Sequence, residues 1–387
     1  MDKIKRSIVL FYAIYFLQGM CFYGPVATLY RQSAGLTLLD ITVLESIATA
    51  LMLLLEIPWG YVADRLGHRK TIIICMFLLA GSKVIFWRAE TFAGFLVERL
   101  VLAAALSGLS GCDSAYLYAC AGEKNAQKTF GVWNGWQTAG YLAAGLTSSF
   151  LLGENYRLAA LFTVVSYTLS AVLTFALTEP KQERKERERP RMREALKGSL
   201  RLAPFLLGAG LLAETAQFVT VFLNQVQYRR SGIPIRWFGV IYAAVTLLSL
   251  FGAKSHRLTG RLGMRRSGVL LFFAGGAACV WMALFPLPVF SVAGVGTLKL
   301  AAALFLPLSL TEQNRRTNGI SAATQLSCNA MVLDFVSLGL NPAFGHAADI
   351  GADRALFLGA LACAAGSALF LWGKRARGGS AAPALAK

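Results

Sequence analysis

Residues 60–70 read Gly-Tyr-Val-Ala-Asp-Arg-Leu-Gly-His-Arg-Lys, and residues 256–266 read His-Arg-Leu-Thr-Gly-Arg-Leu-Gly-Met-Arg-Arg. The two stretches share the core Arg-Leu-Gly-x-Arg-(Lys/Arg), which places Gly67 opposite Gly263, 196 residues further along a chain of 387. Each copy is a short basic turn between two long apolar runs. A motif that occurs once in each half of a membrane chain indicates duplicated halves, an architecture typical of secondary transporters.

The composition is that of a membrane protein. Hydrophobic residues make up 56% of the chain and charged residues 15%, whereas about a quarter of the residues in soluble domains are charged. The apolar residues form runs of about twenty, the length of helix that crosses a bilayer core, and the runs lack the period-two alternation of barrel strands. We therefore expect an all-α membrane protein with twelve transmembrane helices in two pseudo-symmetric six-helix bundles, at residues 8–28, 38–62, 71–88, 93–119, 129–152, 158–177, 203–225, 236–253, 267–286, 289–309, 320–342 and 354–373.

The net charge of +18 is distributed unevenly between the two sides of the membrane. With the amino terminus in the cytoplasm, the inside segments hold 28 Lys and Arg residues and the outside loops hold seven, Arg31 among them. Three more, Lys83, Arg99 and Lys299, fall within predicted helices. This asymmetry follows the positive-inside rule, so we expect a multi-pass protein of the cell membrane with both termini cytoplasmic. It explains the basic charge without a nucleic-acid partner.

The charged linker in the middle of the chain sets the predicted domain boundaries. We expect an amino-terminal six-helix bundle at 1–177, a basic cytoplasmic linker at 178–202, a carboxyl-terminal six-helix bundle at 203–373 and a disordered cytoplasmic tail at 374–387. Apolar residues recur at helical spacing between Met192 and Leu200, which favours a short helix on the inner membrane surface, against anionic lipid headgroups. For 181–189 a flexible solvated tether is an equally good interpretation.

The residues of the first basic turn fit a known pattern at every fixed position, namely Gly60, Asp64, Arg65, Gly67, Arg69 and Lys70. This pattern resembles the signature between helices 2 and 3 of the major facilitator superfamily (MFS). The resemblance implies two bundles that move as rigid bodies about a central cavity lined by helices 1, 4, 7 and 10. It also implies that the turn is a gate, in which Asp64 caps a neighbouring helix and pairs with nearby arginines.

Two further comparisons bear on the subtype. Glu56-Ile-Pro58-Trp-Gly60 is similar to the Glu-x-Pro-x-Gly of drug/proton-antiporter-like members. Helix 5, in contrast, lacks the proline of the glycine motif found in many antiporters of the family, and the second copy of the turn has Gly260 at the position of Asp64.

Ionisable side chains inside the predicted helices are candidates for proton coupling, because a bilayer tolerates them only when they are paired or face water. Glu214 and Lys299 lie halfway along two helices that should line the cavity, so an alternating Glu214–Lys299 pair could couple proton or substrate binding to the conformational change. A static ion pair fits equally well. Asp113 is either a cavity wall or a partner of the basic turn. Glu45 and Arg99 are expected to form an interhelical ion pair.

Aromatic and amide side chains in the predicted cavity helices suit an amphipathic or cationic organic ligand. The same aromatic residue types also favour lipid interfaces. The candidate substrate-binding residues are Tyr15, Gln18, Tyr116, Trp133, Asn134, Trp136, Gln137, Gln217 and Asn224.

Motifs of enzymes and of ATP-driven pumps are missing: the sequence has no His-Glu-x-x-His, Gly-x-Ser-x-Gly or Gly-x-x-x-x-Gly-Lys. We therefore expect no enzyme activity, no cofactor and no metal. The predicted function is proton-coupled export of an amphipathic small organic molecule by a monomer in the lipid bilayer. The alternatives are uptake of a polar nutrient by symport or uniport, and a non-transporting membrane receptor with the same fold.

Overall fold

The computed structural model describes residues 3–122, 125–180, 192–315 and 322–375, and every element in these ranges is helical. Nine of its helical stretches are long and apolar enough to cross a membrane, judged by length and composition. They cover every predicted run except 129–152, which is helical as well, and 320–342, which is helical over its described residues 322–342. The all-α membrane fold is confirmed, and the count of twelve crossings stays a prediction.

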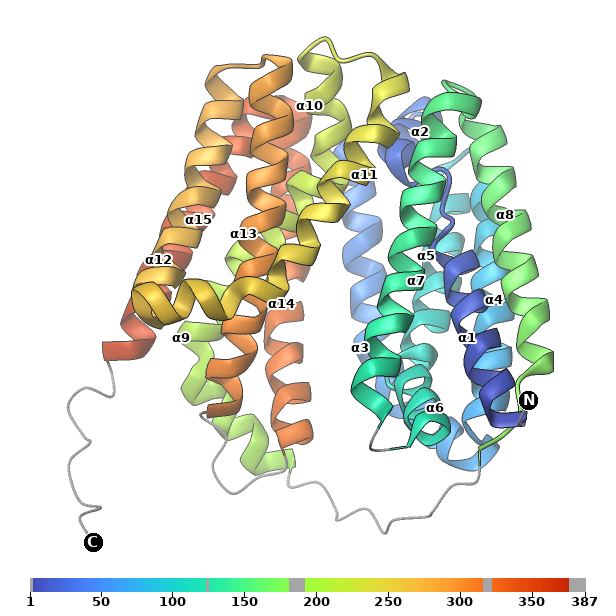
Figure 1. The fold of residues 1–387 in the computed structure, drawn as a ribbon. Helices are drawn as coiled ribbons and strands as arrows, with labels where there is room; N and C mark the ends of the chain where they lie inside the picture. The colour runs from blue at the N-terminus through green and yellow to red at the C-terminus, as the bar shows by residue number, and fades with distance from the viewer. Residues whose placement is uncertain (1–2, 123–124, 181–191, 316–321, 376–387) are drawn as a thin grey trace, which may run out of the picture. The chain divides into compact units, whose positions relative to one another are not determined.

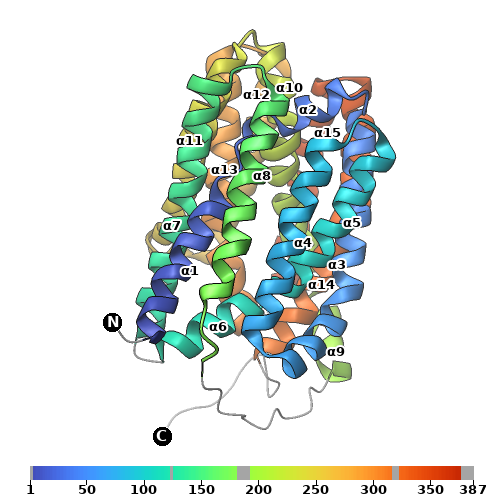
Figure 2. The same cartoon turned by 90° about the vertical axis from the view of Figure 1, so that its right-hand side faces the viewer.

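The chain divides into two compact units, of which unit 1 comprises Met1–Lys185 and Gly232–Thr246. Its helices are blue and green in Figure 1, with α11 in yellow, and α8 packs between α1 and α4 (Figure 2). Its elements are α1 (Lys3–Gly19), η1 (Gly24–Val26), α2 (Ala27–Ser33), α3 (Leu38–Leu66), α4 (His68–Arg88), α5 (Phe92–Leu109), α6 (Cys112–Ala121), α7 (Ala126–Thr147), η3 (Ser148–Leu152), α8 (Tyr156–Leu173), η4 (Thr174–Ala176), η6 (Ile235–Trp237) and most of α11 (Phe238–Leu248).

Unit 2 comprises Glu186–Ser231 and Leu247–Lys387. Its core contains an aromatic cluster of Phe205, Phe272, Phe305 and Phe370. The helix predicted between Met192 and Leu200 is not a separate surface helix, because it continues into the next apolar run. The elements are α9 (Met192–Gln217), η5 (Phe218–Leu223), α10 (Asn224–Arg230), η7 (Ser249–Lys254), α12 (Ser255–Leu284), α13 (Pro288–Arg315), α14 (Ala322–Ile350) and α15 (Ala352–Arg375).

The two basic turns have the same backbone geometry. Gly67 has φ 84° and ψ 159°, and Gly263 has φ 73° and ψ 158°, a conformation that residues with a side chain seldom adopt. Thr71 Oγ1 donates a hydrogen bond to the carbonyl of Gly67 at 2.9 Å, and Ser267 Oγ donates to that of Gly263 at 2.8 Å. The repeat seen in the sequence is therefore a repeat of structure.

Two apolar runs that were predicted as single helices are interrupted. The run 8–28 contains the end of α1 and the start of α2, and the run 93–119 breaks between α5 and α6. At the second break Gly111 has φ 76°, which ends the helical path and lets α6 begin at Cys112. This break places the first turn of α6, with Asp113, inside a membrane-spanning stretch.

A close contact between α1 and α7 sets the geometry of one side of unit 1. A Cβ atom added to Gly140 would lie 2.2 Å from the carbonyl oxygen of Phe16 and 3.0 Å from the Cα of Gly19. Small residues let helix backbones approach closely, as Gly140 does here, whereas a Cβ at Gly131 or Gly135 would meet nothing within 4 Å.

Candidate functional site

Asp113 lies at the amino-terminal end of α6, where a carboxylate is stabilised by the helix dipole. The hydroxyl of Tyr15, on α1, donates a hydrogen bond to Asp113 Oδ2 at 3.0 Å. The backbone N–H of Ser114 donates to Oδ1 at 2.6 Å. A predicted proton-coupling residue and a predicted substrate residue, 98 positions apart, are thus brought into direct contact.

Aromatic rings surround this pair. Trp133 of α7 meets the ring of Tyr15 edge-on, with ring centroids 5.0 Å apart, and it also contacts Phe11 at 5.7 Å. Phe11 stacks on Tyr116 at 5.6 Å. Tyr116 is fully buried, and its hydroxyl donates to the carbonyl of Thr178 at 2.8 Å, so this predicted substrate residue lies in the core of the unit.

Two buried polar atoms beside this cluster have no hydrogen-bond partner among the described residues. They are Oε1 of Gln18, whose residue is 8% exposed and lies one turn after Tyr15 on α1, and Nε1 of Trp133. A buried polar group without a partner costs about 1–3 kcal/mol. Gln18 Oε1 is a hydrogen-bond acceptor, and Trp133 Nε1 is a donor.

The remaining candidate substrate residues are more scattered. Asn134 and Trp136 are exposed on α7, and the ring of Trp136 meets Phe16 edge-on at 5.8 Å. Gln137 is half-buried on the same helix. Gln217 is exposed at the end of α9, while Asn224 is buried and its Oδ1 accepts the N–H of Gln225 at 2.9 Å. The last two belong to unit 2.

Glu214 on α9 and Lys299 on α13 are both half-buried, on helices of unit 2 that contact each other. Whether the two side chains pair stays a prediction. Their role in proton coupling stays a prediction.

The predicted gate residues lie at the junction of α3 and α4. Gly60, Asp64 and Arg65 are exposed on the last turns of α3, and the guanidinium of Arg65 lies 4.4 Å above the ring of Tyr61. Gly67 forms the turn, and Lys70 is exposed on the first turn of α4. A gating role for these residues stays a prediction.

Glu179 caps this turn and was not recognised in the sequence. Its carboxylate accepts the backbone N–H of Arg69 at 3.2 Å, while Arg69 Nη2 donates to the carbonyl of Phe175 at 2.8 Å. A carboxylate at the start of α4 satisfies an amide that has no partner within the helix. The signal in the sequence was an acidic residue followed by Pro180, directly after an apolar run.

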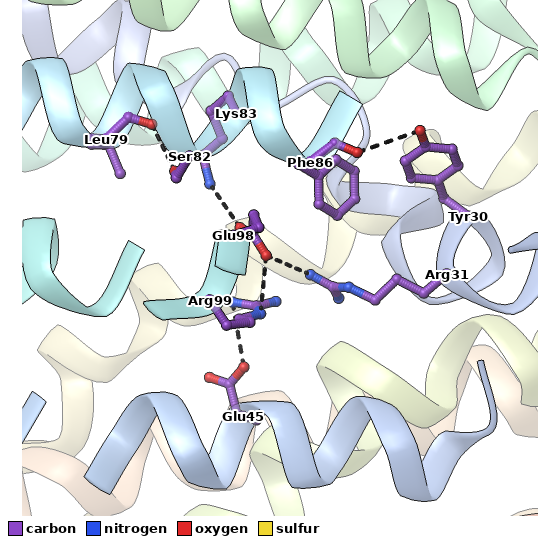
Figure 3. Close-up of polar contacts among 9 residues, drawn as sticks. All are labelled: Tyr30, Arg31, Glu45, Leu79, Ser82, Lys83, Phe86, Glu98 and Arg99. Carbon is purple, nitrogen blue, oxygen red and sulfur yellow. Dashed lines mark hydrogen bonds and ion pairs between the residues drawn. The ribbon is translucent and has the colours of Figure 1, made fainter. Parts of the chain in front are cut away.

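A second polar site lies in unit 1, where five charged residues meet (Figure 3). Glu98 of α5 is at its centre, with Lys83 and Arg31 at 3.9 Å and Arg99 at 3.5 Å. Arg99 also pairs with Glu45 at 3.4 Å, which confirms the ion pair predicted for these two residues. In the part of the chain that the structure describes, no group of three or more His, Cys, Asp or Glu side chains could hold a metal ion.

Glu98, at the centre of this cluster, was not recognised in the sequence, and Arg31 was predicted in the wrong place. Arg31 was assigned to an outside loop, but it is on α2, 3% exposed, with its guanidinium 5.1 Å from the ring centroid of Phe86. Glu98 was overlooked, although a carboxylate within an apolar helix and next to Arg99 was the available signal.

Comparisons with known proteins agree with this fold. The sequence profile described as Major Facilitator Superfamily matches residues 8–333. The chain is 24% identical over 259 residues to "Inner membrane transport protein YnfM" of Escherichia coli (strain K12), with 65% of this chain matched, and 21% identical over 183 residues, 46% of this chain, to "Uncharacterized MFS-type transporter MJ1560" of Methanocaldococcus jannaschii. These matches span 61% and 47% of the relatives' own lengths.

Solved structures share the architecture at low sequence identity. The nucleoside transporter NupG superposes with a TM-score of 0.78 at 17% identity, covering 97% of this chain and 100% of that one. A bacterial homologue of the human lysosomal transporter Spinster, inward-facing and occupied, gives 0.78 at 15% identity, with 97% of each chain covered. A POT family transporter in complex with 5-aminolevulinic acid gives 0.75 at 11%, covering 96% and 97%. With the profile matched over most of its length, the chain belongs to the Major Facilitator Superfamily.

Proposed function

We propose that this membrane transporter exports an amphipathic organic compound in exchange for protons, with Asp113 as the proton-carrying group. The observation that supports the proposal is the hydrogen bond between Tyr15 and Asp113 at the break between α5 and α6, within a cluster of aromatic rings. An ionised carboxylate in such a place attracts a cationic or hydrogen-bond-donating ligand, and a proton that binds to it removes that attraction. Proton and ligand then compete for one group.

Tyr15 has a defined part in this exchange. Its hydroxyl donates to the ionised carboxylate, and this charge-assisted bond stabilises the form of Asp113 that binds the ligand. When Asp113 takes up a proton, its carboxyl group becomes a donor as well, so the bond loses its charge assistance. Because Trp133 contacts the ring of Tyr15, this change in the hydrogen bond of Tyr15 would alter the surroundings of the indole ring.

Gln18 and Trp133 provide the polar contacts for the ligand. The partnerless Oε1 of Gln18 accepts a hydrogen bond, and the partnerless Nε1 of Trp133 donates one. A ligand with an aromatic or aliphatic body, an amine or hydroxyl donor and one acceptor would satisfy both atoms. In the cell, we place both termini in the cytoplasm and the basic inner segments against the anionic leaflet, as the charge distribution indicates.

The test is a growth profile across chemically diverse toxic compounds, in cells that lack their main efflux pumps. These cells express the wild type, Asp113→Asn, Glu214→Gln, or the control Glu154→Gln, which changes an exposed carboxylate in the segment before α8. We expect resistance to amphipathic cations with the wild type and the control, and its loss with Asp113→Asn at equal protein level. Glu214→Gln shows in the same assay whether the carboxylate of unit 2 is needed as well.

Other results would favour the alternatives. Sensitivity that increases with expression indicates uptake. Direct uptake assays would then start from small polar molecules, since one structural neighbour is named a nucleoside transporter and another is described in complex with 5-aminolevulinic acid. An unchanged profile, together with no substrate-induced proton movement in liposomes, would favour a non-transporting receptor. Resistance that survives in Asp113→Asn would remove this residue from the mechanism.

A further inference from the structure

The cluster around Glu98 carries more positive than negative charge. Arg31, Lys83 and Arg99 face Glu45 and Glu98, and the ion pairs between them connect α2, α3, α4 and α5 (Figure 3). Side-chain exposure is 0% for Glu98, 3% for Arg31 and 6% for Lys83, rising to 15% and 22% for Arg99 and Glu45. With every group ionised, one positive charge stays uncompensated in a buried place within a membrane-spanning unit.

An uncompensated buried charge is costly, and the cluster can avoid that cost by releasing one proton. The two arginines keep their protons under all ordinary conditions, because the guanidinium charge is delocalised. Lysine loses its proton much more readily when it is buried. Release from the Lys83 ammonium to water breaks one N–H bond, leaves the electron pair on Nζ, and balances two guanidinium groups against two carboxylates.

The contacts at Glu98 fit this charge balance. Three cationic groups share one carboxylate at 3.5–3.9 Å, and neither oxygen of Glu98 has a hydrogen-bond partner among the described residues. The Arg31 Nε is likewise buried without one. A carboxylate that fully paired a buried ammonium would be expected to accept a hydrogen bond from it at 2.7–2.9 Å.

The other groups that face Lys83 supply no full negative charge. The rings of Tyr23 and Tyr167 lie 5.8 and 5.3 Å from Nζ, and Cys21 is also close enough to interact electrostatically. Aromatic faces stabilise an ammonium by about 0.5–2 kcal/mol, less than the several kcal/mol that an unpaired buried charge costs. The charged residues that face Lys83 are Glu98 and Arg99 on α5 and Arg31 on α2.

We propose that Lys83 is a proton-exchange site of unit 1, neutral in this conformation and protonated when the cluster opens. The site is separate from Asp113 and does not depend on the proposed function. When Lys83 binds a proton, the cluster gains a third positive charge against the two carboxylates, and its charges no longer balance. Any conformational change that separates Arg31 from Glu98 favours protonation of Lys83.

Thermal unfolding of the purified protein in detergent tests the proposal. Wild type and Lys83→Met are compared between pH 7 and 9, a range in which an unfolded lysine stays protonated. If folded Lys83 is neutral, unfolding takes up one proton in the wild type. The unfolding equilibrium of the wild type, relative to Lys83→Met, then falls about tenfold for each pH unit of increase. The free energy of unfolding of the wild type therefore rises relative to that of Lys83→Met as pH rises. Lys128→Met, which removes an exposed lysine on α7, provides the control without such a slope.

A flat difference between wild type and Lys83→Met over this range would overturn the proposal, because it would mean that the folded protein keeps the ammonium. Failure of Lys83→Met to fold would overturn it too, since a neutral side chain of similar size is expected to be tolerated.

Two more variants separate the proposal from an ordinary ion pair. Lys83→Arg fixes the extra charge, so we expect it to unfold at a lower temperature than Lys83→Met; an ordinary ion pair predicts the reverse order. Glu98→Gln destabilises the protein under either view, but a second change to Lys83→Met rescues it only if Lys83 was charged. A clear rescue would refute the neutral lysine.

Discussion

The contact between α1 and α7 allows a sharp test with a matched control on one helix. Gly140→Ala places a methyl group 2.2 Å from the carbonyl oxygen of Phe16. Gly135→Ala, five residues earlier on α7, meets nothing within 4 Å. Both substitutions replace a helical glycine by alanine, so both gain the same helix propensity of about 0.5–1 kcal/mol.

The two variants differ in what the methyl group displaces. At Gly140 the obstacle is backbone, which no side-chain rotation relieves, so α1 and α7 must separate by about 1 Å to restore an ordinary contact distance. Overpacking of this kind costs about 1–3 kcal/mol. We therefore expect Gly140→Ala to be less stable than Gly135→Ala by about 1–3 kcal/mol. The same separation shifts Tyr15 on α1 relative to Trp133 on α7, now 5.0 Å apart between ring centroids.

The assay is thermal unfolding of the two purified variants in the same detergent, followed by transport in liposomes at equal protein content. Gly135→Ala should unfold at or above the temperature of the wild type and transport normally. Gly140→Ala should unfold earlier and transport more slowly. Equal unfolding temperatures for the two variants would refute the close approach of α1 and α7.

Three more outcomes are expected. Glu98→Gln should lower the free energy of unfolding by about 3–5 kcal/mol, because it leaves the buried guanidinium groups of Arg31 and Arg99 around a neutral amide. Chemical denaturation should show a loss well above that of Glu154→Gln. Gly67→Ala and Gly263→Ala should each cost about 1–3 kcal/mol, because a side chain seldom tolerates their backbone conformation. Gly67→Ala should cost more, because its Cβ would lie 3.0 Å from Glu179 Oε1, and equal losses by thermal unfolding would argue against the Glu179 cap. Asp64→Asn should slow the transport cycle with substrate affinity retained, and single-turnover kinetics that show a selective loss of affinity would contradict the gate.

The sequence predicted the helices and the repeated turn because both depend on local patterns. Runs of about twenty apolar residues mark the membrane helices, and the Gly67 turn carries its own motif. The pair Glu45–Arg99 could be predicted because two opposite charges at similar depth in apolar helices need partners. All of these inferences use one segment, or two segments compared by depth alone.

Contacts that depend on the rotation of helices about their axes could not be predicted. Tyr15 and Asp113 were separate candidates, and nothing in their spacing shows that α1 turns the hydroxyl toward α6. The break at Gly111 was missed because the apolar run continues through it. Arg31 was taken for a loop residue because it lies between two apolar runs, whereas the chain forms another helix there and buries it.

The internal repeat has a consequence for how chemistry is divided along the chain. At the offset of 196 that relates Gly67 to Gly263, Arg31 corresponds to Gln227. Arg31 lies against the rings of Phe86 and Phe95, and Gln227 Nε2 donates to the carbonyl of Met282 and to Ser291 Oγ, at the same offset from those two phenylalanines. The positions that match Glu45, Lys83, Glu98 and Arg99 hold Ile241, Cys279, Gly294 and Val295.

The repeated scaffold thus carries charged residues at these positions in its first copy and neutral residues in its second. The contact sites occur in both copies, while the guanidinium, ammonium and carboxylate groups of the first are replaced in the second by the amide of Gln227, the thiol of Cys279, the glycine Gly294 and two aliphatic side chains. Grafting the five neutral residues onto unit 1 together would ask whether the duplicated scaffold still folds once its charges are gone.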